Sequence, residues 1–419
     1  MESSKTLPKV SPATPKVLKI THIITSIEGG AGKACLNLHR ALLNEKVDSK
    51  VLFLYGDDKG QAAVYPAKTV NTLLRKALRK TGLSGRKEDL IYKEIKKVGG
   101  HYETVSLPYS NYQLHQHPLV KQADVIHLHW IGDFVDLASF FANVAKPIVW
   151  TLHDMNPVEG IFHFKNDQNA NPALAEIDQK IRLQKTQIIE RYQPYLITSS
   201  LHCENKIKEK QLNCASTTIP CIIDTEKWAA ISKRDAKNAL GLANDCVTIG
   251  FGAQMLKHPF KGYKVFRETL NQLIEEHQLP IQLLTFGAYD QMEEALNDSK
   301  VRHLGNLSQQ LLNTAYAAMD IFVVSSNEES FGQVGFEALL CNTPIIATTT
   351  GAMPEYAAFP SSLFEMNDSE KLKQNIINTI ALINVADTSL KNVRNNVINW
   401  YMAARPLQRH IELYETLTA

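Results

Sequence analysis

The chain has 419 residues, 44% of them hydrophobic, and its 45 lysines and arginines nearly balance 43 acidic residues. This length allows two domains with separate cores, and the near-neutral charge argues against a globally basic nucleic-acid-binding protein. No run approaches the roughly 18 apolar residues needed to span a bilayer, and residues 1–16 lack a signal-peptide core, so we expect a cytoplasmic protein with a flexible N-terminal tail.

Apolar runs alternate with helical patterns in the first half of the chain. The runs expected to be strands are 17–25, 49–56, 124–131, 147–154 and 195–200. Most of them stop at polar residues, as expected where parallel strands deliver their carboxyl ends to a ligand crevice. This βα alternation predicts an α/β, doubly wound parallel-sheet domain over residues 17–224.

A second series of the same kind follows an interdomain linker expected at 225–246. Its strands are expected at 247–254, 281–289, 320–326 and 343–351. The pattern predicts a second doubly wound domain over 247–395. The last segment, 396–419, is expected to form two helices broken at Pro406, which can cross back to the first domain.

A basic stretch at 68–100 interrupts the first domain. Leucines and small apolar residues recur at helical spacing in 70–78, and Arg75, Lys76, Arg79 and Lys80 occupy the other side. We hypothesise that residues 68–97 contact an anionic membrane surface, which would make the protein peripheral at the inner face of the membrane. The alternative is a soluble helix with solvated charges. A nucleic-acid role is not expected, because aromatic residues are not interleaved there.

A glycine-rich segment, 26–33, follows the first predicted strand and is expected to be a loop that opens a helix. Glycines let the backbone approach a ligand, and a helix N-terminus favours an anion. Ile27 and Ala34 stand where a P-loop needs glycine and Ser/Thr, and Cys35 breaks the dinucleotide fingerprint. A tight turn without a ligand remains the alternative.

The most specific motif begins with Glu329-Ser330-Phe331-Gly332-Gln333 and runs to Glu337, eight positions after Glu329. It follows a predicted strand, and we expect a helix over 331–340 whose N-terminal amides at 331–334 bind phosphate. Two glutamates about two helical turns apart can hold two ends of a polyhydroxylated ligand. Hydroxyl groups at both ends with phosphate between them describe a nucleotide sugar.

This motif resembles the E-x7-E motif of the GT-B retaining glycosyltransferases of family 4 (glycosyltransferase group 1), and the likeness extends over nearly the whole chain from residue 17. The segment around Trp150 to Met155 is similar to bacterial transferases of exopolysaccharide, O-antigen and colanic-acid type. The resemblance implies two Rossmann-like domains facing across a cleft. It also implies transfer of a hexosyl unit, with retention, from a UDP- or GDP-type sugar that binds to the second domain.

By this resemblance His153, Glu329 and Lys261 are the catalytic residues. The donor-binding residues are Gly29, Gly30, Gly252, Lys257, Lys261, Gly305, Asn306, Leu307, Glu329, Ser330, Phe331, Gly332, Gln333 and Glu337. Glu329 would bind sugar hydroxyls and Glu337 the ribose. Lys257 is expected to supply the charge of an arginine that the family often has where this chain has Ala253.

No cofactor or metal is expected. The six cysteines form no C-x-x-C pair, and His127, His129 and His153 show no ligand spacing for zinc. His127 and His129 are expected to share one face of a sheet as cleft-lining or structural residues.

The resemblance implies a glycan or lipid-linked acceptor in surface polysaccharide or lipopolysaccharide synthesis. The sequence leaves two alternatives: a nucleotide-sugar epimerase of the same fold, and a non-catalytic sugar-nucleotide-binding or membrane scaffold protein. Release of free nucleotide only with an acceptor would separate a transferase from both.

Overall fold

The computed structural model describes residues 17–67, 87–228, 231–256, 258–277, 279–288, 301–357, 362–385, 390 and 392–419. Residues 68–86 of the expected basic helix and Lys257 lie outside them. No helix in these ranges combines the length and the hydropathy needed to cross a membrane.

The first lobe is built on a parallel sheet of seven strands in the order β3-β2-β1-β4-β5-β6-β7. The strands are β1 (Lys19–Ser26), β2 (Asp48–Tyr55), β3 (Val64–Pro66), β4 (Val125–Leu128), β5 (Ile148–Leu152), β6 (Tyr195–Thr198) and β7 (Ser216–Thr218). The chain order reverses between the neighbours β1 and β4. In open parallel sheets this switch point marks the ligand crevice at the carboxyl ends of the strands.

Helices cover both faces of this sheet because its central strands are apolar on both sides. The helices of this lobe are α1 (Gly29–Asn44), α3 (Lys87–Val98), α4 (Pro118–Gln122), α5 (Leu137–Asn143), α6 (Lys165–Ala170), α7 (Ala175–Tyr192) and α8 (Leu201–Glu209), with short 3-10 helices η1 (Leu114–Gln116), η2 (Asn156–Val158) and η3 (Pro172–Leu174). Of these, α3 and α6 pack on η3. Ile20, Val125 and Val149 pack on one face with Leu38 of α1. The opposite face forms a separate core under α5 and α7.

The second lobe repeats the plan with six parallel strands in the order β10-β9-β8-β11-β12-β13. They are β8 (Val247–Met255), β9 (Ile281–Ala288), β10 (Val301–His303), β11 (Ile321–Val324), β12 (Ile345–Thr348) and β13 (Leu363–Phe364). The helices are α9 (Lys233–Ala239), α10 (Tyr263–His277), α11 (Gln309–Ala318), α12 (Gln333–Leu340), α13 (Met353–Tyr356) and α14 (Ser369–Asn384), with η4 (Thr225–Lys227) and η5 (Pro259–Lys261). The switch point lies between β8 and β11. The two lobes confirm the expected pair of doubly wound parallel-sheet domains.

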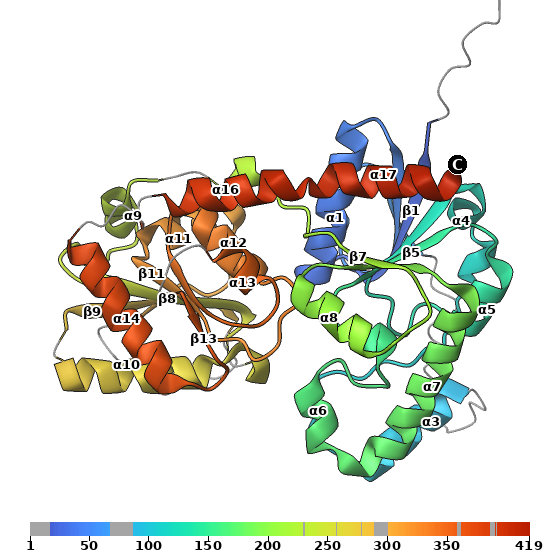
Figure 1. The fold of residues 1–419 in the computed structure, drawn as a ribbon, viewed down its shortest axis with the longest axis horizontal. Coiled ribbons are helices and arrows are strands. Elements are labelled where there is room, and N and C mark those ends of the chain that lie inside the picture. The colour runs from blue at the N-terminus through green and yellow to red at the C-terminus, as the bar shows by residue number, and fades with distance from the viewer. Residues whose placement is uncertain are drawn as a thin grey trace, which may run out of the picture.

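Two segments join the lobes. Within 225–246, the expected linker, α9 packs on α11 because Ala236, Leu240 and Leu242 are buried in the core of the second lobe. The last two helices, α16 (Val393–Ala404) and α17 (Pro406–Thr418), run along one edge of both lobes (Figure 1). α16 packs on α12, and α17 packs on α1 and β4 of the first lobe.

Candidate functional site

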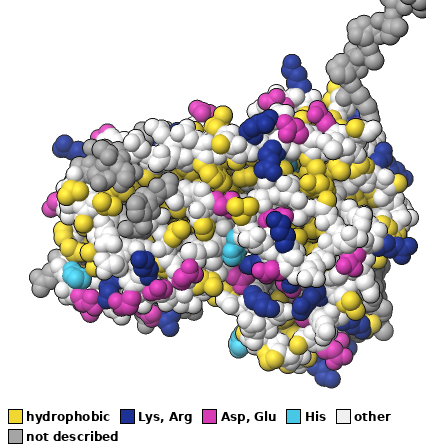
Figure 2. Space-filling view, viewed as in Figure 1, with side chains coloured by type: hydrophobic (Ala, Val, Ile, Leu, Met, Phe, Trp, Pro, Cys, Tyr) yellow, Lys and Arg dark blue, Asp and Glu magenta, His cyan; other side chains and the backbone are white. Residues whose placement is uncertain are grey.

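A cleft of about 700 Å³ lies where the carboxyl ends of the two sheets face each other. Segments that follow β1, β4 and β5 line it from one side. The carboxyl-terminal parts of β8 and β9 and the segments that follow β8, β10 and β11 line it from the other. Both switch points therefore open onto one cavity, as expected for a ligand shared by two doubly wound domains. Histidine, acidic and basic side chains gather where the lobes meet (Figure 2).

The glycine-rich segment is the first part of α1, which begins at Gly29, so the expected loop over 26–33 is wrong for its second half. Gly29 has φ +73°, and a Cβ on Gly32 would lie 2.2 Å from the carbonyl carbon of Ile27. Gly30 meets no atom within 4 Å of an added Cβ. Gly32 is therefore required by packing against Ile27, whereas the space beside Gly30 is open.

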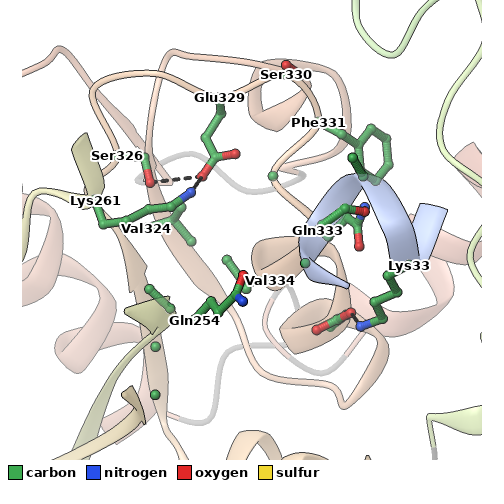
Figure 3. A pocket seen from close by; sticks show the side chains of 18 of the residues that line it. Lys33, Gln254, Lys261, Val324, Ser326, Glu329, Ser330, Phe331, Gln333 and Val334 are labelled. Atoms are coloured by element: carbon green, nitrogen blue, oxygen red, sulfur yellow. Dashed lines mark hydrogen bonds and ion pairs between the residues drawn. The ribbon is translucent and has the colours of Figure 1, made fainter. Parts of the chain in front are cut away.

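Glu329 lies in the loop between β11 and α12 and points to Lys261 across one end of the cleft (Figure 3). Lys261 Nζ is 2.5 Å from Glu329 Oε1, and the Ser326 hydroxyl donates to the same oxygen at 3.0 Å. The carboxylate is thus held by one donor at the end of η5 and one that follows β11. It remains 13% exposed toward the cavity.

Glu337 lies at the opposite end of the cleft, one turn inside α12. It is buried, forms an ion pair with Lys33 of α1, and accepts a hydrogen bond from the Tyr316 hydroxyl at 3.2 Å. Burial raises the pKa of Glu337, and the Lys33 ammonium opposes that shift. Lys33 comes from the first lobe, so this pair spans the cleft (Figure 3).

Helix α12, which follows Glu329 and contains Glu337, begins at Gln333, two residues later than expected. Gly332 adopts the left-handed conformation with φ +83°, and its carbonyl accepts from the Tyr356 hydroxyl at 2.7 Å. A Cβ there would lie 2.2 Å from the Met353 sulfur, so Gly332 ends the loop and starts the helix. Glu329 is therefore not helical. The first turn of α12, where backbone amides lack acceptors within the helix, begins at Gln333, which lines the cleft.

His153 follows β5 and lines the cleft from the first lobe. Its backbone carbonyl accepts from the Ser330 hydroxyl of the second lobe at 2.7 Å, and its Nε2 lies 3.0 Å from His129 Nδ1. Burial lowers the pKa of His153 to about 4, and Asp154 opposes the shift. The ring is neutral at pH 7 and can donate or accept a hydrogen bond without charge.

The structure brings most of the expected site residues together. Those that line the cleft are Gly29, Gly30, His153, Gly252, Lys261, Asn306, Leu307, Glu329, Ser330, Phe331, Gly332, Gln333 and Glu337. Gly305 does not line it, and its carbonyl accepts instead from the Gly287 amide at 2.8 Å. Lys257 is outside the described residues.

The cleft is also lined by residues that had not been proposed from the sequence, among them Lys33, Trp130, Gln254 and Ser326. Lys33 is the last residue of the glycine-rich segment, and this place in the segment was the sequence feature that could have identified it. Gln254 lies near the carboxyl end of β8, next to Ala253, where the arginine of the resemblance was missing. Trp130 donates from its indole to Asp154 at 2.9 Å and so helps to hold the residue after His153.

A second cavity of about 430 Å³ continues from the cleft between the lobes. Phe164 stacks on Phe260 with ring centroids 4.3 Å apart, and His258 Nε2 lies 2.6 Å from Glu103 Oε1. Both pairs join the first lobe to the second. The cavity also shares His153, Lys261 and Glu329 with the cleft, so a molecule bound in it would reach the same residues.

Comparisons with known proteins identify sequences that are similar to this chain. Residues 246–381 match the family Glycosyl transferases group 1. The chain is 28% identical over 250 residues to the D-inositol 3-phosphate glycosyltransferase of Corynebacterium jeikeium, covering 55% of this chain and 57% of that protein. It is 30% identical over 142 residues to a probable glycogen synthase of Methanocaldococcus jannaschii, covering 31% and 27%. The matched segments thus span about half or less of these relatives.

Solved structures cover almost the whole chain. The sucrose-phosphate synthase from Thermosynechococcus elongatus has a TM-score of 0.68 at 17% identity, over 95% of this chain and 99% of that one. Anabaena Alr3699/HepE, solved in complex with UDP-glucose, has a TM-score of 0.63 at 17% identity, over 96% and 99%. At this identity the likeness establishes the fold.

Proposed function

Residues 246–381 form a glycosyl transferases group 1 domain on a chain with the GT-B fold, and from this premise we propose that the protein is a glycosyltransferase that moves a hexosyl unit from a nucleoside-diphosphate sugar to a hydroxyl acceptor. One observation carries the proposal. Glu329 and Glu337 occupy two ends of a single interdomain cleft, with a helix N-terminus between them.

The donor fits this arrangement by its chemistry. Glu337 would accept hydrogen bonds from the ribose, and the base would lie near Asn306 and Leu307. The first-turn amides of α12 and Lys261 would bind the diphosphate, since both favour negative charge. Glu329 would accept from hydroxyls of the sugar.

In the transfer itself, the bond from the anomeric carbon to the phosphate oxygen breaks and a bond to the acceptor oxygen forms. Charge develops on the departing diphosphate, where Lys261 and the helix amides would stabilise it. We propose retention of configuration, with the acceptor proton passing to the leaving phosphate oxygen on the same face. These protein groups supply positive charge without a metal, so we expect EDTA to leave turnover unchanged.

For the acceptor, we propose a glycan or lipid-linked glycan in surface polysaccharide synthesis, bound in the second cavity. The chemistry of its lining supports this: the Phe164 and Phe260 rings can pack on sugar faces, and Glu103 can accept from hydroxyls.

We further propose that residues 68–97 hold the protein at an anionic membrane. Flotation with anionic liposomes at low salt should be lost when Arg75, Lys76, Arg79 and Lys80 are all changed to glutamine; no flotation of the unchanged protein would contradict this part.

The primary test is a release assay for UDP and GDP with a panel of nucleotide sugars. UDP-glucose comes first because it is bound in Anabaena Alr3699/HepE. We expect one donor to raise the melting temperature and to release nucleotide faster when a glycan acceptor is added. An altered sugar formed without an acceptor would indicate an epimerase, and binding without any turnover would indicate a scaffold protein.

A further inference from the structure

Three histidines lie beneath α1 and α17 on one face of the first sheet. His22 on β1 pairs in register with His127 on β4, and His129 follows two residues later on the same face. Their exposed fractions are 0%, 0% and 2%. The proposed glycosyl transfer assigns no role to any of them. Burying three imidazoles costs free energy unless their nitrogens find hydrogen-bond partners.

His22 and His129 continue as a hydrogen-bonded chain into the donor cleft. His22 Nδ1 lies 3.0 Å from His129 Nε2, and His129 Nδ1 lies 3.0 Å from His153 Nε2. His127 is outside this chain, because its two ring nitrogens are bound to the Tyr414 and Thr151 hydroxyls at 2.6 and 2.7 Å. The chain therefore has a buried end at His22 and a cleft end at His153.

A metal site is the competing interpretation, since His22, His127 and His129 each offer a nitrogen within 4.8 Å of the others. The ring geometry disfavours it. His127 and His129 are stacked, with centroids 4.3 Å apart and planes 25° apart, so their in-plane lone pairs do not converge on one point. All four ring nitrogens of these two residues are already hydrogen-bonded.

The protonated nitrogens of His22, His129 and His153 depend on one another. Burial lowers the pKa of His22 and His129 well below 6.5, and His153 is neutral as described above, so each ring carries one N–H at pH 7. A neutral imidazole donates from one nitrogen and accepts at the other. Two arrangements are then possible: all three rings carry the proton on Nδ1, or all three carry it on Nε2.

The buried end of this hydrogen-bonded chain favours the first arrangement. His22 Nε2 is buried and has no hydrogen-bond partner among the described residues. A proton placed there would be a buried donor without an acceptor, and orphaned buried N–H groups are rarer than orphaned acceptors. At the cleft end, the carboxylate of the adjacent Asp154 attracts positive charge on the His153 ring.

We propose that His22 and His129 are positioning residues that fix His153 as the Nδ1–H tautomer, so that the neutral ring offers a hydrogen-bond donor to an oxygen of the donor sugar. The contact with sugar rests on the proposed function. The tautomer does not, because it is a property of the protein without ligand.

The decisive measurement is a long-range ¹H–¹⁵N correlation spectrum of the ligand-free protein labelled on its histidine rings, at pH 7. The resonances of His22, His129 and His153 are assigned by the signals missing from single His→Gln variants. We expect Nδ1 of all three to be protonated and Nε2 to have a shift typical of an unprotonated nitrogen. The reverse pattern would overturn the proposal, as would one zinc per chain lost in His22→Phe.

Two variants distinguish an effect of the hydrogen bonds between the histidines from a general effect of altered packing. His129→Phe removes the middle ring and should move the His153 nitrogens toward averaged shifts. His39→Phe is the control: His39 is buried on the same side of the sheet but bonded to Ser49 and the Ala62 carbonyl, and its loss should leave His153 unchanged. Equal changes in both variants would contradict the proposal. If His129→Phe does not fold, the spectrum of the unchanged protein still decides.

With an active donor, His129→Phe should lower kcat about 10-fold with a smaller change in KM, because one oriented hydrogen bond is lost. Donor turnover that fails in every variant and in the unchanged protein would contradict the proposed function and leave the tautomer measurement intact. Unchanged kcat in His129→Phe would contradict the positioning role.

Discussion

Lys33 of α1 and Glu337 of α12 form an ion pair that spans the cleft, although they are 304 residues apart in the chain. Glu337 is 4% exposed and Lys33 is 38% exposed. Burial opposes the negative charge on Glu337, and Lys33 is the cation that compensates for it. Lys33 of the opposite lobe therefore counteracts the rise in the pKa of the carboxylate proposed to bind the ribose.

Lys33→Met should weaken donor binding. Without the ammonium, burial raises the pKa of Glu337 further, and a protonated carboxyl accepts fewer hydrogen bonds from a ribose. We expect the donor KM to rise about 10-fold at pH 6 and less at pH 8, where the carboxyl is ionised more often. Titrations of nucleotide binding at both pH values measure this. Lys50→Met, on β2 and away from the cleft, is the control; an equal or pH-independent effect would contradict the argument.

Lys261→Ala and Glu329→Ala should each abolish most transfer while the fold stays intact. Loss of one group that stabilises developing charge, as proposed for Lys261, typically costs about 10²–10³-fold in kcat. Loss of Glu329 removes the proposed acceptor for the sugar hydroxyls. Among the described residues, removing Lys261 also leaves Glu329 with the Ser326 hydroxyl as its remaining donor. Release of nucleotide is measured beside melting temperatures, with Lys264→Ala on the exposed side of α10 as the control. Near-normal turnover in either variant would count against the site.

Gly32→Ala and Gly30→Ala should separate folding from ligand approach. An added Cβ on Gly32 would overlap the Ile27 carbonyl carbon, so we expect Gly32→Ala to lower the melting temperature by several degrees. Gly30 has open space, so Gly30→Ala should leave the melting temperature unchanged and raise the KM for donor or acceptor. An unchanged KM in Gly30→Ala would mean that no ligand approaches this backbone.

The sequence predicted the core strands well because their signal is local. β4 and β11 are buried at every position, and such strands read as short continuous apolar runs. The edge strands β3 and β10 were not predicted, since each has three residues and at most one buried position. Their existence depends on hydrogen bonds to β2 and β9, which no local pattern encodes.

The site was predictable to the extent that its residues lie in one motif. Glu329, Gly332 and Glu337 were identified together, but the start of α12 at Gln333 was missed, because the left-handed Gly332 delays the helix. The partners across the cleft could not be predicted. Lys33 and His129 acquire their contacts with Glu337 and His153 only when two lobes and two neighbouring strands are assembled.

The buried histidines should make the protein sensitive to acid, and His410 allows this to be tested outside the proposed site. Its Nδ1 donates to the Pro406 carbonyl at 2.7 Å, and burial lowers its pKa to about 4. In the unfolded chain the pKa is about 6.5, so between pH 6.5 and 4 the unfolded state binds more protons. The stability that this group contributes is complete above about pH 6.5 and is lost as the pH falls toward 4.

His410→Leu should therefore lose less stability between pH 7.5 and 5 than the unchanged protein. The expected difference is about 2 kcal/mol, since each pH unit below 6.5 costs up to about 1.4 kcal/mol for one such group. Urea unfolding at the two pH values measures it, and residual acid sensitivity should remain because burial also lowers the pKa of His22, His127 and His129. His277→Gln, on an exposed helix end, is the control. The same acid loss in His410→Leu as in the unchanged protein would show that His410 is not kept neutral by the fold.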